Sequence, residues 1–357
     1  MKNENGYVMV IVLFIMSILT VLVTSGLRTA NTGLDIAVNN VIHEQNFHAA
    51  EGAMYKGAFW ASKNDASVWE NTIQDGEGTF SHGSFSFNVE SWKNGGEEVI
   101  TYLDPVTNLS LPELLITGTG KHIRGGNSVV SGIWVMRPIF FMPETPLWVF
   151  DTIKGQGNVQ VKADTGSGNR DEVWFSMTPV APYELPPKID CPDGDGCSWN
   201  TAPEPFPTDE VRERIKLAAD YSGTTFPSDL VAGSSPEKPV IIYINGDVTV
   251  NNGTMKQNEN TGKFEGFGVI FVDGSAKING NIQWNGIIIV RDSVEIGNGT
   301  ADIEGALIAG HNTTPGMPSD GIIDVSLSGS IDINYNRNTL VNLWKKTAQP
   351  VCLSWFN

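Results

Sequence analysis

The sequence GVIFVDGSAKI occupies residues 268–278, and a close copy of it, GIIIVRDSVEI, follows at residues 286–296. The glycine that opens each copy recurs after 18 residues and again after 19, where GALIA begins at Gly305. An earlier copy, INGDVTV, lies at residues 244–250, and the polar residues 251–263 that follow it are expected to form a loop. A short period of this kind is typical of the turns of a parallel β-helix, in which equivalent strands stack on one another.

The alignment of the copies predicts which side chains stack. Ile244, Val272 and Val290 are expected to form one apolar column, and Val250, Ile278 and Ile296 a second one. We therefore predict three parts for the second half of the chain: a possible first β rung in residues 141–180, β-helix-like repeats in residues 237–335, and a C-terminal cap with Trp344 and Trp355 in residues 336–357.

The central strands of the repeats are apolar on both faces, as in Val269–Val272 and Ile287–Val290. One face fills the β-helix, so the other face needs a cover. The Pro-rich insertion at residues 181–236 contains a candidate helix, Thr208–Tyr221, with acidic residues near its start. Its apolar residues Ile215 and Leu217–Ala219 are expected to cover the outer face of the repeats.

An antiparallel sheet is predicted upstream of the repeats, in residues 63–140. Residues 80–90 alternate apolar and polar, and residues 114–120 and 129–136 form two further strand-like stretches around the turn signal RGGN at 124–127. The sequence therefore predicts an α+β protein. Its long N-terminal helix packs on an antiparallel sheet, and a mainly-β domain with short parallel β-helix rungs follows.

The N-terminal residues predict a membrane-spanning helix. No charged residue occurs between Asn5 and Gly26, and the apolar run Tyr7–Val23 is about 25 Å long as a helix, the short end of what spans a bilayer. Leu27, Leu34, Val38 and Val41 then recur at helical spacing, so residues 27–62 are expected to continue the transmembrane helix of residues 7–26 as an amphipathic helix. The alternatives are a cleaved secretory signal and a buried core helix.

The composition favours a folded, β-rich protein. Of the 357 residues 40% are apolar and 18% charged, with 38 Gly and 19 Pro, which suits many short strands joined by turns. Lys and Arg number 23 against 40 Asp and Glu, so the net charge is −17. Such a chain repels nucleic acid and anionic lipid headgroups at long range, and no nucleic acid partner is expected.

The first six residues, MKNENG, are polar and end in Gly6 directly before Tyr7 and the apolar run. They resemble the leader of type IV pilins and pseudopilins, which a membrane peptidase removes after the glycine before it methylates the new N-terminus. The stretch QNFHAAEGA at residues 45–53 resembles the helix signature of PilX-like minor pilins, on Phe47, Ala49, Ala50 and Glu51. Together the two matches cover about residues 1–60 and imply processing between Gly6 and Tyr7.

One position departs from the pattern of most pilins. The fifth residue of the mature chain is usually Glu, and here it is Ile11. The chain is similar in this to PilX-like minor pilins and K-type minor pseudopilins, which act at or near the filament tip or in assembly initiation. A carboxylate in lipid is tolerated when it neutralises the ammonium of the next subunit, and a subunit with nothing above it meets no such ammonium. The expected filament-core residues are Ile11, Leu27, Leu34 and Val41.

The resemblance implies a location and a set of partners. The partners are prepilin peptidase and, through the N-terminal helix, other minor and major pilins. The location is the bacterial inner membrane before assembly and then the extracellular pilus at or near its tip, where the β-rich head would be displayed for capping, priming or surface contact. A membrane-anchored or polymer-forming β-helix scaffold resembling bactofilins is the alternative, although bactofilins lack such a leader.

The sequence offers candidates for a disulfide and a metal site. Cys191 and Cys197 flank the turn PDGDG and would close a small loop in an oxidising compartment, which leaves Cys352 over. Asp193 and Asp195 are calcium candidates, but two carboxylates are far short of the six or more oxygen ligands that calcium takes. The outward residues of the repeats are mixed in sign, as on a solvated face, so no enzyme activity and no cofactor are expected.

Overall fold

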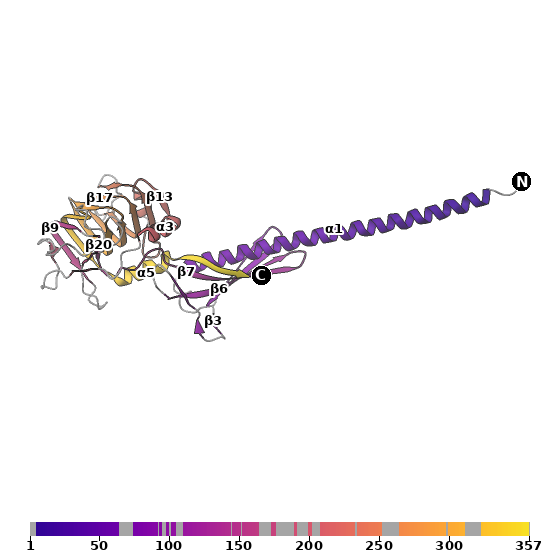
Figure 1. Ribbon diagram of the computed structural model, residues 1–357, viewed down its shortest axis with the longest axis horizontal. Coiled ribbons are helices and arrows are strands. Elements are labelled where there is room, and N and C mark those ends of the chain that lie inside the picture. Colours follow the sequence, from indigo (N-terminus) through magenta and orange to yellow (C-terminus); the bar gives the residue numbers. More distant parts are fainter. Residues whose placement is uncertain are drawn as a thin grey trace.

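The computed structural model describes residues 5–63, 74–91, 93–94, 98–99, 101–104, 110–143, 145–150, 152–163, 173–175, 189–190, 199–201, 208–232, 234–251, 264–297, 299–310 and 323–356. Within these residues a long helix projects from a β-rich head, with an antiparallel sheet beside its second half and a curled parallel sheet at the far end of the molecule (Figure 1). The predicted combination of an apolar N-terminal helix with a sheet-rich, solenoid-like region is confirmed at this level.

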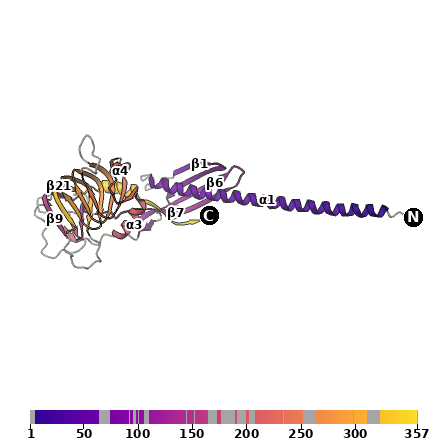
Figure 2. The same ribbon diagram turned by 90° about the horizontal axis from the view of Figure 1, so that it is seen from above.

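Helix α1 (Asn5–Lys63) has 59 residues and is roughly 88 Å long at about 1.5 Å per residue. It contains no proline and its glycines stand singly, so nothing in the sequence interrupts its hydrogen-bond ladder. The first part of the helix projects freely, and its last part lies along the antiparallel sheet in both Figure 1 and Figure 2.

The antiparallel sheet has the strand order β1-β2-β6-β7-β22. Its strands are β1 (Gln74–Phe80), β2 (Gly83–Ser91), β6 (Ser110–His122), β7 (Asn127–Arg137) and β22 (Gln349–Phe356). The short strand β5 (Thr101–Leu103) pairs with β6, and β3 (Lys93–Asn94) pairs with β4 (Glu98–Val99) as a separate ribbon. Gly125 and Gly126 form the β6–β7 turn with φ of 99° and 80°, where RGGN predicted a turn.

Small residues allow α1 to lie directly on β6. A side chain at Gly118 would overlap the backbone of Ala50 and Met54, and a side chain at Gly120 would overlap the backbone of Asn46 and Ala50. Around this close approach the helix and the sheet share one buried cluster, which includes Ala50, Ala53, Met54, Phe87, Ile116, Val130 and Trp134. The sheet therefore buries its helix-facing side by backbone contact in the middle and by large side chains around it.

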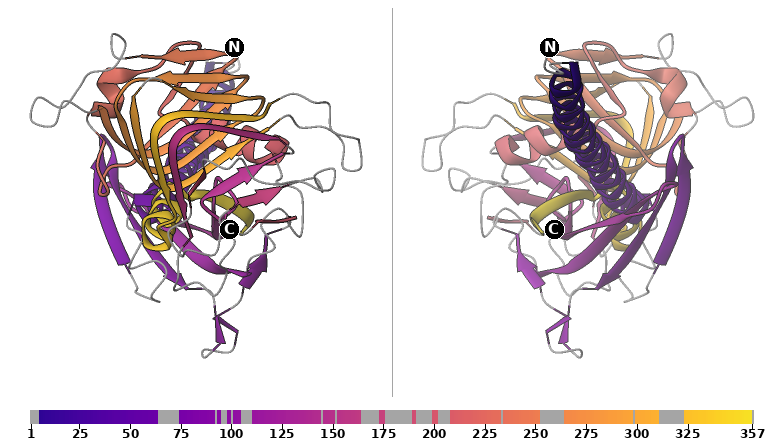
Figure 3. Two further views of the ribbon diagram at one scale, coloured as in Figure 1. Left: turned by 90° about the vertical axis from the view of Figure 1, so that its left-hand side faces the viewer. Right: turned by 90° about the vertical axis from the view of Figure 1, so that its right-hand side faces the viewer.

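The parallel sheet is built from rungs of two strands each. The first strands are β14 (Val240–Asn245), β16 (Phe264–Asp273), β18 (Ile282–Val290) and β20 (Thr300–Ala309). The second strands are β15 (Val248–Val250), β17 (Ala276–Asn279), β19 (Val294–Gly297) and β21 (Val325–Asn334). Strands of successive rungs pair in parallel, and the sheet curls around one interior (Figure 3).

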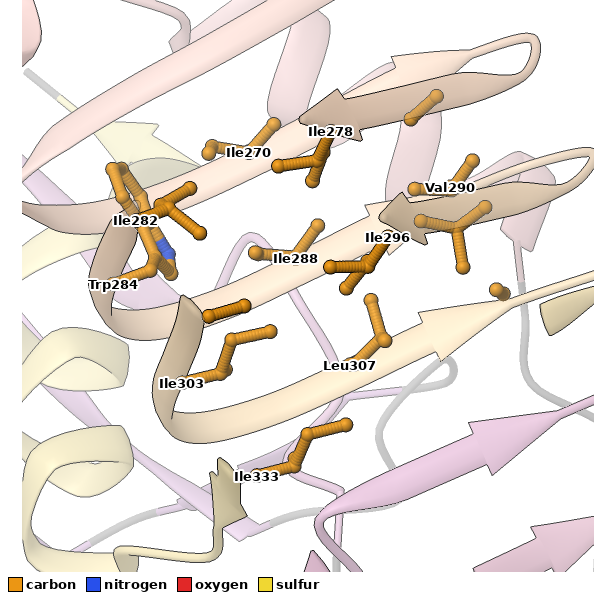
Figure 4. Close-up of a cluster of buried hydrophobic side chains, with 14 of the residues drawn as sticks. Ile270, Ile278, Ile282, Trp284, Ile288, Val290, Ile296, Ile303, Leu307 and Ile333 are labelled. Carbon is orange, nitrogen blue, oxygen red and sulfur yellow. The ribbon is translucent and has the colours of Figure 1, made fainter. Parts of the chain in front are cut away.

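Both predicted columns are observed in the strand register. Ile244 pairs with Val272 and Val272 with Val290, while Val250 pairs with Ile278 and Ile278 with Ile296. Their side chains belong to one buried cluster that also holds Trp284 (Figure 4). The glycines that open the copies have φ between 137° and 148°, and each lies against a carbonyl oxygen of the preceding rung that a side chain would overlap, at Gly268, Gly286 and Gly305.

The upstream rung forms, but it stacks on the last rung of the chain and not on the first. Strand β8 (Leu147–Val149) pairs with β20, and β9 (Ile153–Lys162) pairs with β21. Beyond them lie β10 (Val173–Phe175), β11 (Ile189–Asp190) and β12 (Trp199–Thr201), while β13 (Tyr221–Gly223) pairs with β14 at the opposite end. The chain therefore enters the solenoid at one end, crosses to the other end and returns rung by rung.

Two helices cover the outer face of the first strands. Helix α3 (Thr208–Ala218) supplies Val211 and Ile215, and helix α5 (Arg337–Thr347) supplies Leu340 and Leu343 to a second buried cluster with residues of β14, β16, β18 and β20. The expectation that Leu217 takes part is wrong, because it is 88% exposed. Residues two apart on a helix face different directions, so a helix that buries Ile215 turns Leu217 outward. A short helix, α4 (Ser228–Ala232), packs against β16 through Val231.

The C-terminal residues do not cap the solenoid. After α5 the chain leaves it, and β22 pairs with β7 as the edge strand of the antiparallel sheet, with Gln349 opposite Arg137. Trp344 packs against the cluster that α5 covers, whereas Trp355 lies near Phe47 of α1, with ring centroids 6.3 Å apart. Residues 138–348 are thus inserted between two neighbouring, antiparallel strands of one sheet.

Candidate assembly interface

The N-terminal half of α1 is apolar and bare. Its mean hydropathy reaches 2.6 over 18 residues, and no part of that stretch is buried by the described chain. The hydroxyl groups of Ser17, Thr20 and Thr24 each donate a hydrogen bond to the carbonyl oxygen four residues earlier, at 2.8, 2.7 and 2.6 Å. A helix that satisfies its own polar groups in this way suits a lipid environment. By length and composition it is able to cross a membrane.

The expected filament-core residues lie on this bare part of the helix. Ile11, Leu27, Leu34 and Val41 are all exposed, Leu34 to 64%. Gly6 and Tyr7 lie at the start of α1, but the position of the Tyr7 side chain is outside the described part of the structure. From residue 27 to residue 41 the helix extends about 22 Å beyond the predicted span, still exposed. Large apolar side chains in such a run indicate a surface that another molecule covers.

The helix signature of the PilX-like resemblance lies where α1 meets the sheet. Ala50 is fully buried against β6, and Phe47 packs at the edge of the same cluster. Ala49 is half-buried, and its Cβ lies close to Gly120. Glu51 is half-buried, and one of its carboxylate oxygens lies 3.5 Å from Nδ1 of His48. In this chain the signature therefore marks the docking of the helix on the head.

A groove of about 390 Å³ lies where α1 reaches the tips of the sheet. One wall is formed by the α1 residues Ala37, Val38, Val41, Ile42 and Gln45, and the other by His82, His122, Ile123 and Arg124 from the β1–β2 and β6–β7 turns. The Arg124 backbone N–H donates to Nδ1 of His122 at 3.1 Å, so that ring nitrogen is the acceptor. Ile123 is 74% exposed at the mouth. An apolar wall opposite imidazole and guanidinium groups suits a segment with one apolar and one polar side.

A buried ion-pair triad joins the antiparallel sheet to the solenoid. The carboxylate of Asp104, which follows β5, is fully buried and accepts two hydrogen bonds from the Arg214 guanidinium of α3, both at 3.1 Å. Nε of Arg137, at the end of β7, lies 3.3 Å from the same carboxylate. Arg214 also donates to the carbonyl oxygen of Pro138 at 3.1 Å. The triad therefore links residues on both sides of the point where the chain leaves the sheet.

A second polar network holds α3 on the outer face of the solenoid. The Tyr243 hydroxyl donates to Asp273 at 2.7 Å, Arg291 donates to Asp273 at 3.0 Å, and Arg212 of α3 lies 3.7 Å from it. Burial acts to raise the pKa of Asp273, but the hydrogen bonds from Tyr243 and Arg291 and the two guanidinium charges outweigh it and lower the pKa below its ordinary value. Burial and the bond to Asp273 raise the pKa of Tyr243 to about 12.

The structure does not test the disulfide and calcium candidates from the sequence. Cys191, Cys197, Asp193 and Asp195 all lie outside the described residues. Cys352 is an exposed free thiol on β22, and partial burial raises its pKa. Among the described residues, no three His, Cys, Asp or Glu side chains are placed to hold a metal ion together.

Sequence patterns alone gave no indication of the Asp104 triad. Its members lie at positions 104, 137 and 214, on three different segments of the chain. Only the crossing of the chain from β7 to the solenoid brings them together. The chain matches no protein-family model, and no curated protein shares detectable sequence similarity with it.

Proposed function

We propose that this protein is a PilX-like minor pilin of a type IV pilus or a related filament, with a structural role in filament initiation or tip capping. The observation that carries the proposal is the division of α1 into two halves. The first half is apolar, bare and long enough to cross a membrane, while the second half is fixed to a sheet by the contact of Ala50 with Gly118. A polar leader that ends in Gly6 precedes the bare half.

The proposed mechanism begins in the inner membrane. The apolar half of α1 partitions into the bilayer, and prepilin peptidase cleaves between Gly6 and Tyr7. The helix is then extracted into the growing filament, where exposed residues such as Leu27, Leu34 and Val41 contact the helices of other pilins. Ile11 offers no carboxylate to the N-terminal ammonium of a subunit above it, which favours the tip over the shaft.

The proposed role of the head is display. In Figure 1 the solenoid lies at the end of the molecule opposite the N-terminus, so a subunit held by α1 would present the solenoid outward. The triad of Asp104, Arg137 and Arg214 would keep the solenoid in a fixed direction relative to the helix. A solenoid with this placement serves as a rigid spacer or as a surface for contact outside the cell.

The second candidate function is that of a membrane-anchored or polymer-forming scaffold resembling bactofilins. The stack of short parallel rungs from β14 to β20 favours it. Phe226 and Leu230 pack on the interior cluster beside the β14 end of the stack. Their packing argues against end-to-end growth, because it covers the surface on which another stack would have to continue. The processing site at Gly6 distinguishes the two functions, because a scaffold would retain its first six residues.

The test is the mature N-terminus. The full-length chain is recovered from membranes of cells with and without prepilin peptidase, and its intact mass and N-terminal sequence are measured. The proposal predicts a start at methylated Tyr7 only when the peptidase is present, and Gly6→Val should abolish the cleavage while the chain stays in the membrane. A start at Met1 in both cells, or a start near Leu27, would contradict the proposal.

A further inference from the structure

Three hydroxyl residues of the predicted span and most of the large apolar residues exposed beyond it lie along one line on α1, which Ser25 and Ile36 do not join. Within the predicted span the line holds three hydroxyl residues, Ser17, Thr20 and Thr24. Beyond the span it holds four exposed apolar residues, Leu27, Leu34, Val38 and Val41. The positions follow one another at alternating steps of three and four residues. The complete set, here called the heptad face, is Ser17, Thr20, Thr24, Leu27, Asn31, Leu34, Val38, Val41, Gln45, His48, Gly52, Tyr55 and Phe59.

Alternating steps of three and four residues are the pattern by which one helix packs along another. In lipid, small Ser and Thr side chains mark helix contacts because they let two backbones come close. In water, apolar side chains mark such contacts because the partner helix covers them. The heptad face has small hydroxyl residues inside the predicted span and large apolar residues outside it, so both halves independently indicate a helical partner.

In its last turns the heptad face lies on the side of α1 away from β6, although Tyr55 also contacts Trp134 of β7, with ring centroids 5.6 Å apart. The residues that α1 buries against β6 and its neighbours include Ala50, Ala53, Ala58 and Ala61, and at 3.6 residues per turn they lie roughly opposite Tyr55 and Phe59. Tyr55 and Phe59 are accordingly exposed, to 55% and 62%. A side chain added at Gly52 would meet nothing within 4 Å. Beside Val38, Val41 and Gln45 the β1–β2 and β6–β7 turns form the opposite wall of the groove, so a second helix along this face has to fit between them and α1.

We propose that the partner is the α1 helix of a second copy of this chain, parallel and in register. Two copies anchored in one membrane have the same orientation, so equal positions of the heptad face lie at equal heights. Glu51 and Lys56 flank the face five residues apart, the spacing at which charges pair between parallel helices. In the single chain Nζ of Lys56 lies 4.7 Å from the ring centre of Phe85 and Glu51 lies 3.5 Å from His48, so both side chains would turn to the partner on pairing. Asn31 on the face is the kind of residue that fixes register in a parallel pair.

The area that can be covered supports a pair that needs the membrane. Outside the predicted span, Leu27, Leu34, Val38, Val41, Tyr55 and Phe59 would cover roughly 300–550 Å² per copy, against about 800 Å² in a standard stable interface. The small residues Ser17, Thr20 and Thr24 must supply the remainder through close packing in lipid. Val38, Val41 and Gln45 also line the groove below Ile123, so the partner helix would close the mouth of the groove.

The pairing rests on the membrane anchoring in the proposed function, and only its timing relative to assembly rests on the filament role. The heptad face includes the expected filament contacts Leu27, Leu34 and Val41, so self-pairing and entry into a filament exclude each other on this face. The pair is therefore the form that the chain takes in the membrane before assembly, when no other pilin helix covers these residues.

The test is photo-crosslinking of the full-length chain in membranes of a host that has no filament proteins and no prepilin peptidase. Two copies with different affinity tags are co-expressed, and a photoreactive phenylalanine analogue replaces either Leu34 or Val41. The matched controls carry the analogue at Thr32 or Asn39, which are exposed on the opposite side of the helix. The proposal predicts adducts that contain both tags, with a yield several-fold higher at positions 34 and 41 than at 32 and 39.

A charge exchange tests the register. Glu51→Lys should reduce the two-tag adduct from an analogue at position 55 several-fold, and the double variant with Lys56→Glu should restore it. Equal yields at all four positions, adducts only to other proteins, or no two-tag adduct would each overturn the proposal. Processing plays no part in this host, so a failure here leaves the minor-pilin function standing, and a failure of cleavage at Gly6 leaves the self-pairing standing.

Discussion

The antiparallel sheet and the solenoid cover their apolar faces in different ways. The solenoid curls around its own interior, and its outer face is covered by α3 and α5, which belong to the same inserted segment, residues 138–348. The sheet instead depends on α1, which lies on β6 through Gly118 and Gly120. The solenoid is therefore a self-contained insertion, whereas the sheet couples the head to α1, the helix proposed to enter the assembly.

The largest effect is expected inside the solenoid. Trp284→Ala removes a fully buried indole from the interior cluster and should lower the free energy of unfolding by about 3–5 kcal/mol. The measurement is urea unfolding of the detergent-solubilised chain, with hydrogen exchange to locate the change. Exchange should rise in β16, β18 and β20 and stay low in β6 and β7.

The matched control for Trp284 is Trp355→Ala on β22, where the indole is largely exposed. It should change the free energy of unfolding by less than about 1 kcal/mol. If Trp284→Ala raised exchange equally in the solenoid and in the antiparallel sheet, the solenoid would not be the self-contained unit of the comparison.

A slightly smaller effect is expected at the junction of the two regions. Asp104→Ala leaves the guanidinium groups of Arg137 and Arg214 without their carboxylate, and breaking a buried pair in this way costs about 3–5 kcal/mol when the charges cannot reach water. Both guanidinium groups are partly exposed, so the lower end of this range is expected. Limited proteolysis should show cleavage between β7 and the solenoid that the natural chain resists.

The control for Asp104 is Asp209→Ala, an exposed carboxylate whose guanidinium contacts on the solenoid surface are 3.9 Å long. It should leave the cleavage pattern unchanged, because exposed pairs contribute little. Unchanged proteolysis of Asp104→Ala would mean that the triad does not hold the two regions together.

The contact between α1 and the sheet is tested by Gly118→Val. The new side chain would overlap the backbone of Ala50, so the helix has to move, at a cost of about 1–3 kcal/mol. The control is Gly52→Ala on the opposite side of the helix, which has open space and should stabilise α1 by up to about 1 kcal/mol. Equal unfolding midpoints for the two variants in urea would show that α1 does not lie on β6.

The smallest effect is a pH dependence in the cover of the solenoid. Because the pKa of Asp273 is lower in the folded protein, its contribution to stability is complete above the ordinary aspartate value of about 3.9 and is lost as the pH falls through the folded value. Exchange in α3 should therefore rise in acid before the solenoid interior opens. Asp273→Asn should flatten this acid dependence of α3, and an unchanged pH profile would contradict the assignment.

The sequence predicted the parts of the fold that repeat or are periodic. The copies from residue 244 to residue 296 fixed which side chains stack, because a one-residue shift would turn every apolar residue outward. The long helix was predicted from its unbroken apolar run and from the apolar residues that recur at helical spacing after it. The outward position of Leu217 shows where such predictions fail. Leu217 was expected to face the solenoid because it is apolar, but it lies two residues from the buried Ile215 and so points in another direction.

The long-range arrangement could not be predicted from the sequence. Nothing in residues 349–356 indicates that β22 returns to β7, and nothing in residues 147–162 indicates that β8 and β9 stack on β20 and β21. Strand pairing of this kind depends on which edges remain free after the rest of the chain has folded. The Asp104 triad forms only as a result of that arrangement, so it could be found only in the structure.

The most direct test of the central claim is the amount of this protein in filaments. Filaments would be sheared from the cells that produce the protein, purified and analysed by quantitative mass spectrometry against the main subunit. The account predicts that the protein is present, begins at methylated Tyr7 and is far less abundant than the main subunit, as expected for a subunit at the tip. Amounts comparable to the main subunit, or its absence from the filaments while it stays in the membrane from Met1, would contradict the account.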